Sequence, residues 1–332
     1  MPGISFVLYE HCLSSTITAL IDAFSICNSL CEDSGRSNGQ ASSSLFDMKI
    51  AAVAKKPVLT NGGVWIQPDA TFGEIKKSDL IIIPPRLFAR QPNDVELAHI
   101  LPWLKKNYQQ GVRIGTLCTG SFVLAMTGLL DNKIATTNWL YVNKFRRQFP
   151  KVILKPERIL TEDDGLICSG AITAMYNLAL YAIEIFGSAE LSRKCARILL
   201  VDHNRKSQQP YMAANFHRNH GDRQILAGQR WFEKNFARQF SIDDVANFVG
   251  LSPRHFKRRF KQATGENPLR YLQQIRLEKA KSMLETGPEN IETITNEVGY
   301  EDSRTFRRLF KKYTSLSPRE YRDRFGAVHE NN

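Results

Sequence analysis

The sequence predicts an α/β domain built on a mostly parallel sheet, followed by an all-α domain with two helix-turn-helix units. Three observations lead to this prediction. Residues 1–201 alternate short apolar runs with longer helical stretches, and the carboxyl-terminal third is helical and contains an internal repeat. The chain of 332 residues also exceeds the size at which one hydrophobic core usually stops growing, so we expect two domains.

The elements of the first domain follow one another in a regular order. Four runs rich in Ile and Val are typical of strands buried on both faces: residues 4–9, 48–54, 80–84 and 112–117. Helical stretches over residues 13–30 and 95–110 separate them. Asp164 and Gly165 mark the turn of a β-hairpin, and helices over residues 172–186 and 189–201 complete the domain.

The polar residues 202–223 have no clear periodicity, which indicates a linker. We therefore place the first domain at residues 1–205, the linker at 206–224 and the second domain at 225–326.

The composition favours a protein with a polyanionic partner. The formal net charge is +12, which suits nucleic acid or an anionic membrane surface. No apolar run approaches the roughly 20 residues that span a bilayer, and the amino-terminal residues lack the basic region of a signal peptide, so we expect a cytoplasmic protein without a membrane partner. The positive charges cluster within helical units rather than in an amphipathic tail, which also disfavours the membrane alternative.

Six cysteines in a chain of this length are too sparse for a disulfide framework. Cys27 and Cys31 are four residues apart on a predicted helix and could hold two metal ligands, but no second pair of ligands follows nearby. We interpret them as buried thiols and expect neither a metal nor a cofactor.

Residues 242–271 and 291–321 repeat one pattern, at an offset of 49 residues before the turn and 50 after it. Each copy consists of a short helix, a glycine turn and a second helix, where Gly250 and Gly299 permit the positive φ that ends the first helix. Signals for the start of the second helix are Ser252 with Pro253 in one copy, and Asp302 or Ser303 in the other. These features are typical of a helix-turn-helix motif.

The second helix of each copy has an apolar face and a cationic face. Three- and four-residue spacing places Phe256, Phe260 and Ala263, and likewise Phe306, Phe310 and Tyr313, toward a core. Basic helical faces are commonly only solvated, but two such copies favour DNA binding. Residues predicted to read bases are Arg254, His255, Arg258, Ser303, Arg304 and Arg308; those predicted to bind phosphate are Lys257, Lys261, Arg307, Lys311 and Lys312.

Residues 268–286 are predicted to form the helix that joins the two copies, with one face formed by Leu272, Ile275, Lys279 and Met283. Such a helix would separate the copies by roughly 27 Å, since each helical residue advances by 1.5 Å. Successive major grooves on one side of DNA are about 34 Å apart, so one chain could occupy two of them.

This tandem arrangement resembles the AraC/XylS family of transcription regulators over about residues 225–325. The segment "E-V-G-Y-E-D-S-R-T-F-R-R-L-F-K-K-Y-T-S-L-S-P-R-E-Y-R" carries the resemblance with almost no departure. The resemblance implies a sequence-specific regulator that binds double-stranded DNA.

In the first domain, the segment "G-V-R-I-G-T-L-C-T-G-S-F-V-L-A-M" presents Cys118 at a tight turn between a strand and a helix. We expect the first amides and the dipole of that helix to stabilise a thiolate or a bound anion. Nucleophilic catalysis also needs a base within hydrogen-bond reach of the thiol. The first 201 residues contain two histidines, His11 and His99, and neither has an obvious place beside Cys118.

The strand-to-helix turn and the later "E-R-I-L-T-E-D-D-G-L-I-C-S-G-A-I-T-A-M-Y-N-L-A-L" resemble the PfpI-type, class I glutamine amidotransferase-like superfamily. More narrowly, they resemble the version found in GlxA-like regulators. This resemblance implies a flavodoxin-like, amidotransferase-like sheet domain. It also identifies two departures from the enzymes: Asn138 replaces a common histidine before Trp139, and no acidic residue occurs near Thr16.

Because Asn138 cannot take up a proton as imidazole can, the sequence favours a binding pocket over a catalytic site. The predicted ligand contacts are Cys118, Thr119, Gly120, Asn138 and Ser169, with no catalytic residue. An alternative is that Cys118 is a core thiol beside a vestigial pocket.

Two functions remain open at this point. The first is a transcription regulator, activator or repressor, whose first domain senses a small effector and mediates self-association. The family resemblance implies a homodimer and an amino-acid-like or quaternary amine effector. The second is a cysteine-dependent hydrolase or amidotransferase with an appended DNA-binding domain.

Overall fold

The structure is a computed structural model that describes residues 1–37, 44–87, 93–202, 205, 207–214, 216 and 218–327. The chain divides into two units, Met1–Gln208 and Gln209–Asn332. Each unit is described by itself. No helix in the described ranges combines the length and apolar character that crossing a membrane would require.

The amino-terminal unit contains one sheet of seven strands in the order β10-β11-β7-β6-β1-β2-β5. Its strands are β1 (Gly3–Val7), β2 (Asp47–Ala52), β5 (Ala70–Thr71), β6 (Leu80–Ile83), β7 (Arg113–Leu117), β10 (Leu160–Asp163) and β11 (Leu166–Ser169). All neighbouring pairs are parallel except the β10–β11 hairpin. The predicted strands and the mostly parallel sheet are confirmed, and Asp164 and Gly165 form the hairpin turn with positive φ angles.

Smaller elements accompany this sheet. The short strands β3 (Val58–Leu59) and β4 (Trp65–Ile66) form an antiparallel pair, and β8 (Ile134–Ala135) and β9 (Ile153–Leu154) form a parallel pair. The helix α4 (Val142–Gln148) packs near α3 through the rings of Phe122 and Phe145, whose centroids are 4.9 Å apart.

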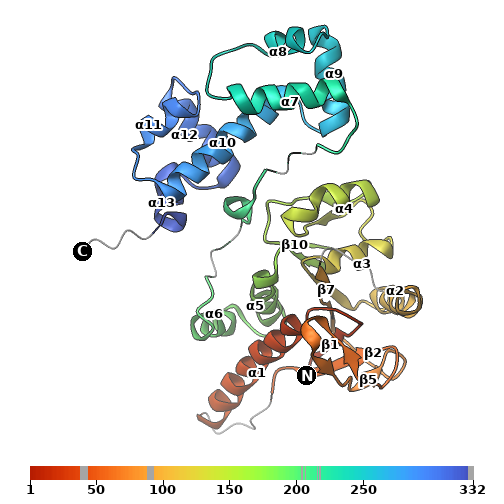
Figure 1. Cartoon of the computed structure of the whole chain (residues 1–332). Helices are drawn as coiled ribbons and strands as arrows, with labels where there is room; N and C mark the ends of the chain where they lie inside the picture. Colours follow the sequence, from red (N-terminus) through yellow and green to blue (C-terminus); the bar gives the residue numbers. More distant parts are fainter. Residues whose placement is uncertain are drawn as a thin grey trace. The chain divides into compact units, whose positions relative to one another are not determined.

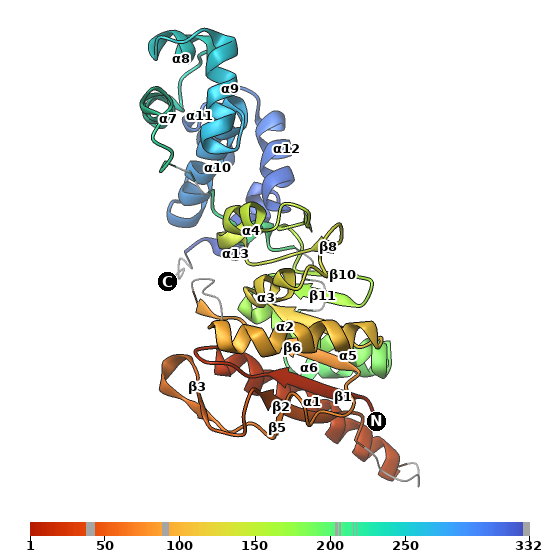
Figure 2. The same cartoon turned by 90° about the vertical axis from the view of Figure 1, so that its right-hand side faces the viewer.

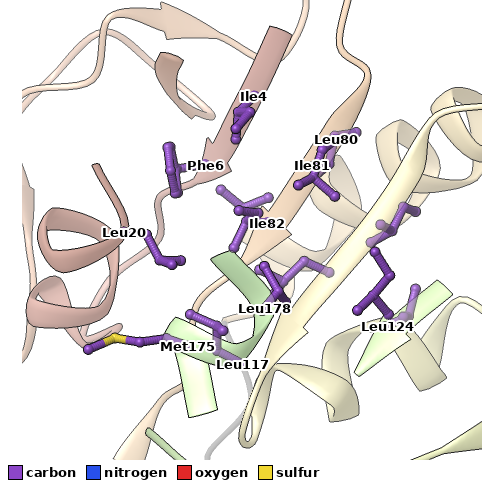
Figure 3. Packing of buried hydrophobic residues seen from close by; sticks show 14 of the residues in the cluster. Ile4, Phe6, Leu20, Leu80, Ile81, Ile82, Leu117, Leu124, Met175 and Leu178 are labelled. Atoms are coloured by element: carbon purple, nitrogen blue, oxygen red, sulfur yellow. The ribbon is translucent and has the colours of Figure 1, made fainter. Parts of the chain in front are cut away.

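Helices cover both faces of the sheet, as the buried Ile- and Val-rich strands require. On one face lie α1 (Ser14–Ser37), α5 (Met175–Phe186) and α6 (Ala189–Ile198), and on the other lie α2 (Asp94–Gln109) and α3 (Gly120–Met126) (Figure 1). Figure 3 shows Phe6 and Ile82 of the sheet with Leu20 of α1 and Leu178 of α5, and Leu124 of α3 beyond the sheet. These five side chains are buried, so both faces of the sheet contribute to one core.

The carboxyl-terminal unit is wholly helical over its described residues, which confirms the second part of the fold prediction. It contains α7 (Arg223–Asn235), α8 (Ile242–Phe248), α9 (Pro253–Thr264), α10 (Pro268–Thr286), α11 (Ile291–Glu297), α12 (Ser303–Thr314) and α13 (Pro318–Phe325). In Figure 1, α10 runs from the α8–α9 pair to the α11–α12 pair, and Figure 2 shows the same helices turned by 90°.

Helix α10 contributes to two separate cores. Leu272 and Ile275 pack with α7, α8 and α9, whereas Leu277 and Leu284 pack with α11, α12 and α13. The predicted apolar face of α10 is wrong at Lys279, which is exposed. The reason is that α10 faces two partners in succession, so its buried positions follow two stripes rather than one.

Much of the stretch expected to be a linker is fixed by contacts within its own unit. Gln208 is 2% exposed, and its amide nitrogen donates to Thr137 O at 3.0 Å. The residues Gln209–Tyr211 form a short 3-10 helix, in which the ring of Tyr211 lies 5.2 Å from that of Phe325. Asp222 begins α7 as its amino-terminal cap.

Candidate DNA interface and amino-terminal elbow

Helices α8 and α9, and likewise α11 and α12, form two helix-turn-helix units. Gly250 (φ 69°) and Gly299 (φ 87°) occupy the turns in the left-handed conformation that the sequence predicts. The side chain of Ser252 accepts a hydrogen bond from His255 N, and that of Asp302 accepts from Arg304 N and Thr305 N. Each second helix therefore starts at a satisfied cap, and Asp302, not Ser303, is the cap of α12.

Buried aromatic side chains orient both second helices. Phe256 and Phe260 in α9, and Phe306 and Phe310 in α12, are at most 1% exposed. Within α9 the two ring centroids are 5.4 Å apart, and within α12 they are 5.6 Å apart. This packing fixes which side of each helix faces outward, because the rings hold the opposite side against the core.

The outward side carries the residues predicted to meet DNA. Ser303 is half-buried at the start of α12, and all the others are exposed: Arg254, His255, Lys257, Arg258, Lys261, Arg304, Arg307, Arg308, Lys311 and Lys312. Lys257 forms an exposed ion pair with Asp243 of α8 at 3.2 Å. Exposed pairs of this kind contribute little to stability, so Lys257 can exchange Asp243 for a phosphate.

Arg259 is a structural arginine to which the sequence analysis assigned no role. Its guanidinium binds both carboxylate oxygens of Asp222, at 2.8 and 3.1 Å, and donates to Gln224 at 2.7 Å. These contacts attach α9 to the start of α7. Periodicity did suggest a difference, because Arg259 directly precedes the buried Phe260 and is itself half-buried.

The two helix-turn-helix units are held at a defined separation. Arg276 of α10 donates to Phe236 O at 2.8 Å and to Arg238 O at 3.1 Å, and its guanidinium lies 5.1 Å from the ring centre of Tyr300. Gln239 donates to Gly299 O at 3.2 Å. The loop after α7 thus touches the turn of the second unit, and the 19-residue α10 spans about 28 Å at 1.5 Å per residue.

In the amino-terminal unit, Cys118 follows β7 at a strained elbow. Its φ is 52°, a left-handed value that is uncommon for a residue with a side chain. Gly120 starts α3 close to β6, where a Cβ would lie 2.6 Å from Ile83 O. The hydroxyl of Thr119 donates to Arg86 O at 2.7 Å and accepts from Arg86 N at 3.0 Å. Only glycine fits at position 120, and it lets the helix start directly at the sheet edge.

Burial dominates the acidity of the Cys118 thiol. Cys118 is 5% exposed, and burial raises its pKa to about 11 although hydrogen bonds from Thr119 N and the Asn138 side chain favour the thiolate. The expected thiolate stabilisation by the helix start is therefore outweighed, because desolvation disfavours the charged form more strongly. No imidazole or carboxylate of the described residues contributes to this pKa.

The structure places the other predicted pocket residues around the same turn. Asn138 meets the thiol, and its side-chain oxygen accepts from Leu140 N at 2.9 Å. Ser169 is fully buried, donates to Thr116 O at 3.1 Å and accepts from Cys118 N through its backbone oxygen at 2.8 Å. In this conformation the Ser169 hydroxyl supports β7 and is not open to solvent.

A chain of hydrogen bonds leads from the elbow to the end of the unit. The hydroxyl of Thr137 donates to Cys118 O at 3.2 Å, and Thr137 O accepts from the Gln208 side chain at 3.0 Å. A Cβ at Gly170 would lie 2.3 Å from the Gln208 amide nitrogen, so glycine leaves the space that this side chain fills. Sequence reasoning missed Gln208, because nothing local distinguishes it within a polar segment.

Two further groups of the amino-terminal unit concern the predicted thiols and a buried carboxylate. Cys27 is buried as predicted, whereas Cys31, also predicted to be buried, is only half-buried. Cys27 contacts both Cys31 and the distant Cys195 of α6. No set of three metal-binding side chains occurs among the described residues. Glu96 of α2 is buried and accepts from Glu10 N at 2.6 Å, and burial raises the pKa of its carboxyl group.

Comparison with known proteins matches both units to families. The profile of the DJ-1/PfpI family matches residues 40–185, and that of a helix-turn-helix domain family matches residues 245–324. The chain is similar to the HTH-type transcriptional regulator GbdR of Pseudomonas aeruginosa, with 24% identity over 96% of this chain and 84% of that protein. It is also similar to the HTH-type transcriptional regulator GlxA of Rhizobium meliloti, with 28% identity over 68% of this chain and 69% of that protein.

Among solved structures, an AraC family transcriptional regulator from Pseudomonas putida covers 60% of this chain and all of its own. The TM-score is 0.51 at 20% sequence identity, which shows a shared fold.

Proposed function

We propose that this chain is an AraC-type DNA-binding transcription regulator with an amino-terminal DJ-1/PfpI domain, rather than an enzyme. In this proposal it binds one DNA duplex and places α9 and α12 in successive major grooves. The observation that carries the proposal is that two capped helices expose cationic faces on a single frame, at a separation set by α10 and Arg276. The length of α10, about 28 Å at 1.5 Å per residue, is comparable with the groove repeat of about 34 Å in B-DNA.

The proposed roles follow from position along each helix. Residues near the start of a recognition helix reach base edges, whereas residues farther along it meet the backbone. Base readers are Arg254, His255, Arg258, Ser303, Arg304 and Arg308, and phosphate ligands are Lys257, Lys261, Arg307, Lys311 and Lys312.

Selection of genomic fragments by the purified full chain tests this assignment. We expect enrichment of a site with two half-sites about one helical turn apart, and weaker binding to a scrambled duplex at physiological salt. A chain that binds the selected and scrambled duplexes equally would contradict the assignment of base readers.

We further propose that the amino-terminal unit senses a small effector at the elbow, through Cys118, Thr119, Gly120 and Asn138. Ser169, whose buried hydroxyl donates to Thr116 O, supports the turn from behind. The Asn138 amide beside the thiol and the amides at the start of α3 suit an amino-acid-like carboxylate, and a quaternary amine is the alternative effector class. The hydrogen bonds that link Cys118, Thr137 and Gln208 support a route by which effector binding at the elbow affects the residues that lead to the DNA-binding unit. A movement of the turn at Cys118 would shift Thr137, whose backbone oxygen holds the Gln208 side chain.

A thermal-shift screen of amino acids and methylated amines against the full chain tests this sensing role. A ligand that binds only the folded chain raises the melting temperature by mass action. The Asn138→Ala variant should lose the shift, and a Lys151→Ala variant, altered at an exposed lysine, should keep it. If Asn138→Ala keeps the full shift, the effector does not sit at the elbow.

Alkylation tests the non-catalytic role of the thiol. With a pKa near 11, roughly one Cys118 in ten thousand is a thiolate at pH 7, so iodoacetamide should react slowly and faster as the pH rises. Rapid alkylation of Cys118 at neutral pH would contradict a non-catalytic thiol.

We also propose that the regulator acts in the cytoplasm as a homodimer. Analytical ultracentrifugation of the full chain tests the dimer, and a monomer at every concentration would contradict it.

A further inference from the structure

A hollow beside α5 and the start of β10 contains none of the elbow residues. Its volume is about 400 Å³, within the range of small-molecule sites. Ile159 and Leu180, 1% and 3% exposed, form part of its wall, together with Leu160. A hollow of this size with apolar walls accommodates a molecule as large as an amino acid.

Three of the charged and polar side chains that line the hollow have no partner among the described residues. Arg158, Asn177 and Glu184 line it, and their side chains make no hydrogen bond or ion pair with any residue that the structure describes. The ring of Tyr181 lies among them. Arg205 adds a second guanidinium, which also donates to the Thr173 hydroxyl at 3.0 Å. Two cationic groups and one carboxylate thus face one small space.

We propose that this hollow binds a small zwitterion of the α-amino-acid type with an apolar side chain. The ligand carboxylate would pair with Arg158 and Arg205, since guanidinium binds carboxylate through two parallel hydrogen bonds. The ligand ammonium would pair with Glu184. Leu180 and the Tyr181 ring would cover the apolar side chain, so that each part of the ligand meets a complementary surface.

The position of Arg205 links this site to the end of the amino-terminal unit. Ser207 forms an antiparallel bridge with Arg158, and Gln208 N donates to Glu157 O at 2.9 Å. A ligand held by both arginines would therefore fix the last residues of the unit from two sides. This regulatory consequence, unlike ligand binding itself, rests on the proposed function, in which Gln208 connects sensing to DNA binding.

Calorimetric titration of the full chain tests the ligand class. The probes are L-phenylalanine and L-leucine, compared with 3-phenylpropionate, which lacks the ammonium, and 2-phenylethylamine, which lacks the carboxylate. We expect an amino acid to bind at least tenfold more tightly than either single-charge analogue, because each analogue leaves one charged group unpaired. Absence of heat for both amino acids up to about 10 mM would overturn the proposal.

Variants locate the site. Arg158→Ala and Glu184→Gln should each weaken amino-acid binding tenfold or more, and both residues are exposed, so folding should be unaffected. Arg193→Ala, which removes an exposed guanidinium of α6 outside the hollow, is the matched control and should bind as the unaltered chain does. In the ligand complex, amide hydrogen exchange at Ser207 and Gln208 should slow.

Other outcomes overturn the proposal in distinguishable ways. If Arg158→Ala weakens binding but Glu184→Gln does not, the hollow recognises only the carboxylate of the ligand and is a site for simple anions. If Asn138→Ala rather than Arg158→Ala removes binding, the ligand sits at the elbow and the sensing role survives without this site. If Arg158→Ala changes sedimentation of the ligand-free chain but not binding, the hollow is a contact between copies.

Discussion

The two helix-turn-helix units repeat one sequence pattern but differ in what their turns touch. A Cβ at Gly250 would meet nothing closer than Gln224 at 4.0 Å, whereas a Cβ at Gly299 would lie 2.8 Å from Phe236 O and 2.9 Å from Ala237 O. The turn at Gly299 packs against the loop that follows α7, whereas the turn at Gly250 faces open space. Equal local sequence therefore gives equal backbone conformation but unequal tertiary roles.

The two second helices differ in the same way. Arg259 of α9 is tied to Asp222 and Gln224, while the equivalent position of α12 is the half-buried Leu309. The left-handed residue that ends each helix is Gly265 in α9 and Ser315 in α12. The following substitutions test whether these differences have the energetic consequences that the contacts imply.

The largest expected effect is at the second turn. Gly299→Ala should destabilise the chain by roughly 2 to 5 kcal/mol, since it adds left-handed strain to a backbone clash. Gly250→Ala, with the strain alone, should cost about 1 to 2 kcal/mol. Urea unfolding of the full chains measures both, and equal losses would show that the contact with Phe236 has no energetic weight.

The next largest effect should distinguish the proposed base-reading residues from the proposed phosphate-binding residues in their DNA affinity. Arg304→Ala should cost about 1 to 3 kcal/mol of binding and relax discrimination at one base pair, whereas Lys312→Ala should weaken all duplexes alike. Titrations with specific and random duplexes at several salt concentrations make the comparison. Equal losses on both duplexes for Arg304→Ala would refute base reading by that side chain.

Neighbouring arginines of α9 should then behave differently. Arg259→Ala should destabilise the chain by about 1 to 2 kcal/mol, because it leaves the partly buried Asp222 without its bidentate partner. Arg258→Ala should leave the unfolding midpoint unchanged and weaken DNA binding. Paired urea unfolding and duplex titration separate the two roles, and an unchanged midpoint in Arg259→Ala would remove the structural assignment.

The smallest expected effect concerns the ends of the second helices. Ser315→Gly should stabilise the chain by about 0.5 kcal/mol, because glycine adopts the left-handed conformation without the Cβ penalty. Gly265→Ser should destabilise it by a similar or larger amount, although its Cβ would meet open space. Thermal unfolding measures both, and a neutral Ser315→Gly would indicate that the hydrogen bond between Ser315 and Gln209 offsets the strain.

Much of the fold was predictable because its signals are local. Apolar runs marked the central strands, Asp164 and Gly165 marked the hairpin, and the repeat located both helix-turn-helix units with their glycine turns. The apolar face of α10 was harder to predict, and Lys279 was placed wrongly, because one helix serves two cores. For the site residues, periodicity indicated which side of α9 and α12 is exposed, and the strand-to-helix pattern indicated the elbow at Cys118.

By itself, the sequence determined the order of elements, the tandem repeat and the residue types at each recognition helix, because periodicity, caps and turns depend on residues a few positions apart. Only the tertiary structure decided that Arg259 pairs with Asp222, that Cys27 meets Cys195, and that Gln208 occupies the space beside Gly170. It also decided that burial raises the pKa of Cys118 to about 11. These properties depend on desolvation and on partners distant in the chain, which no local pattern specifies.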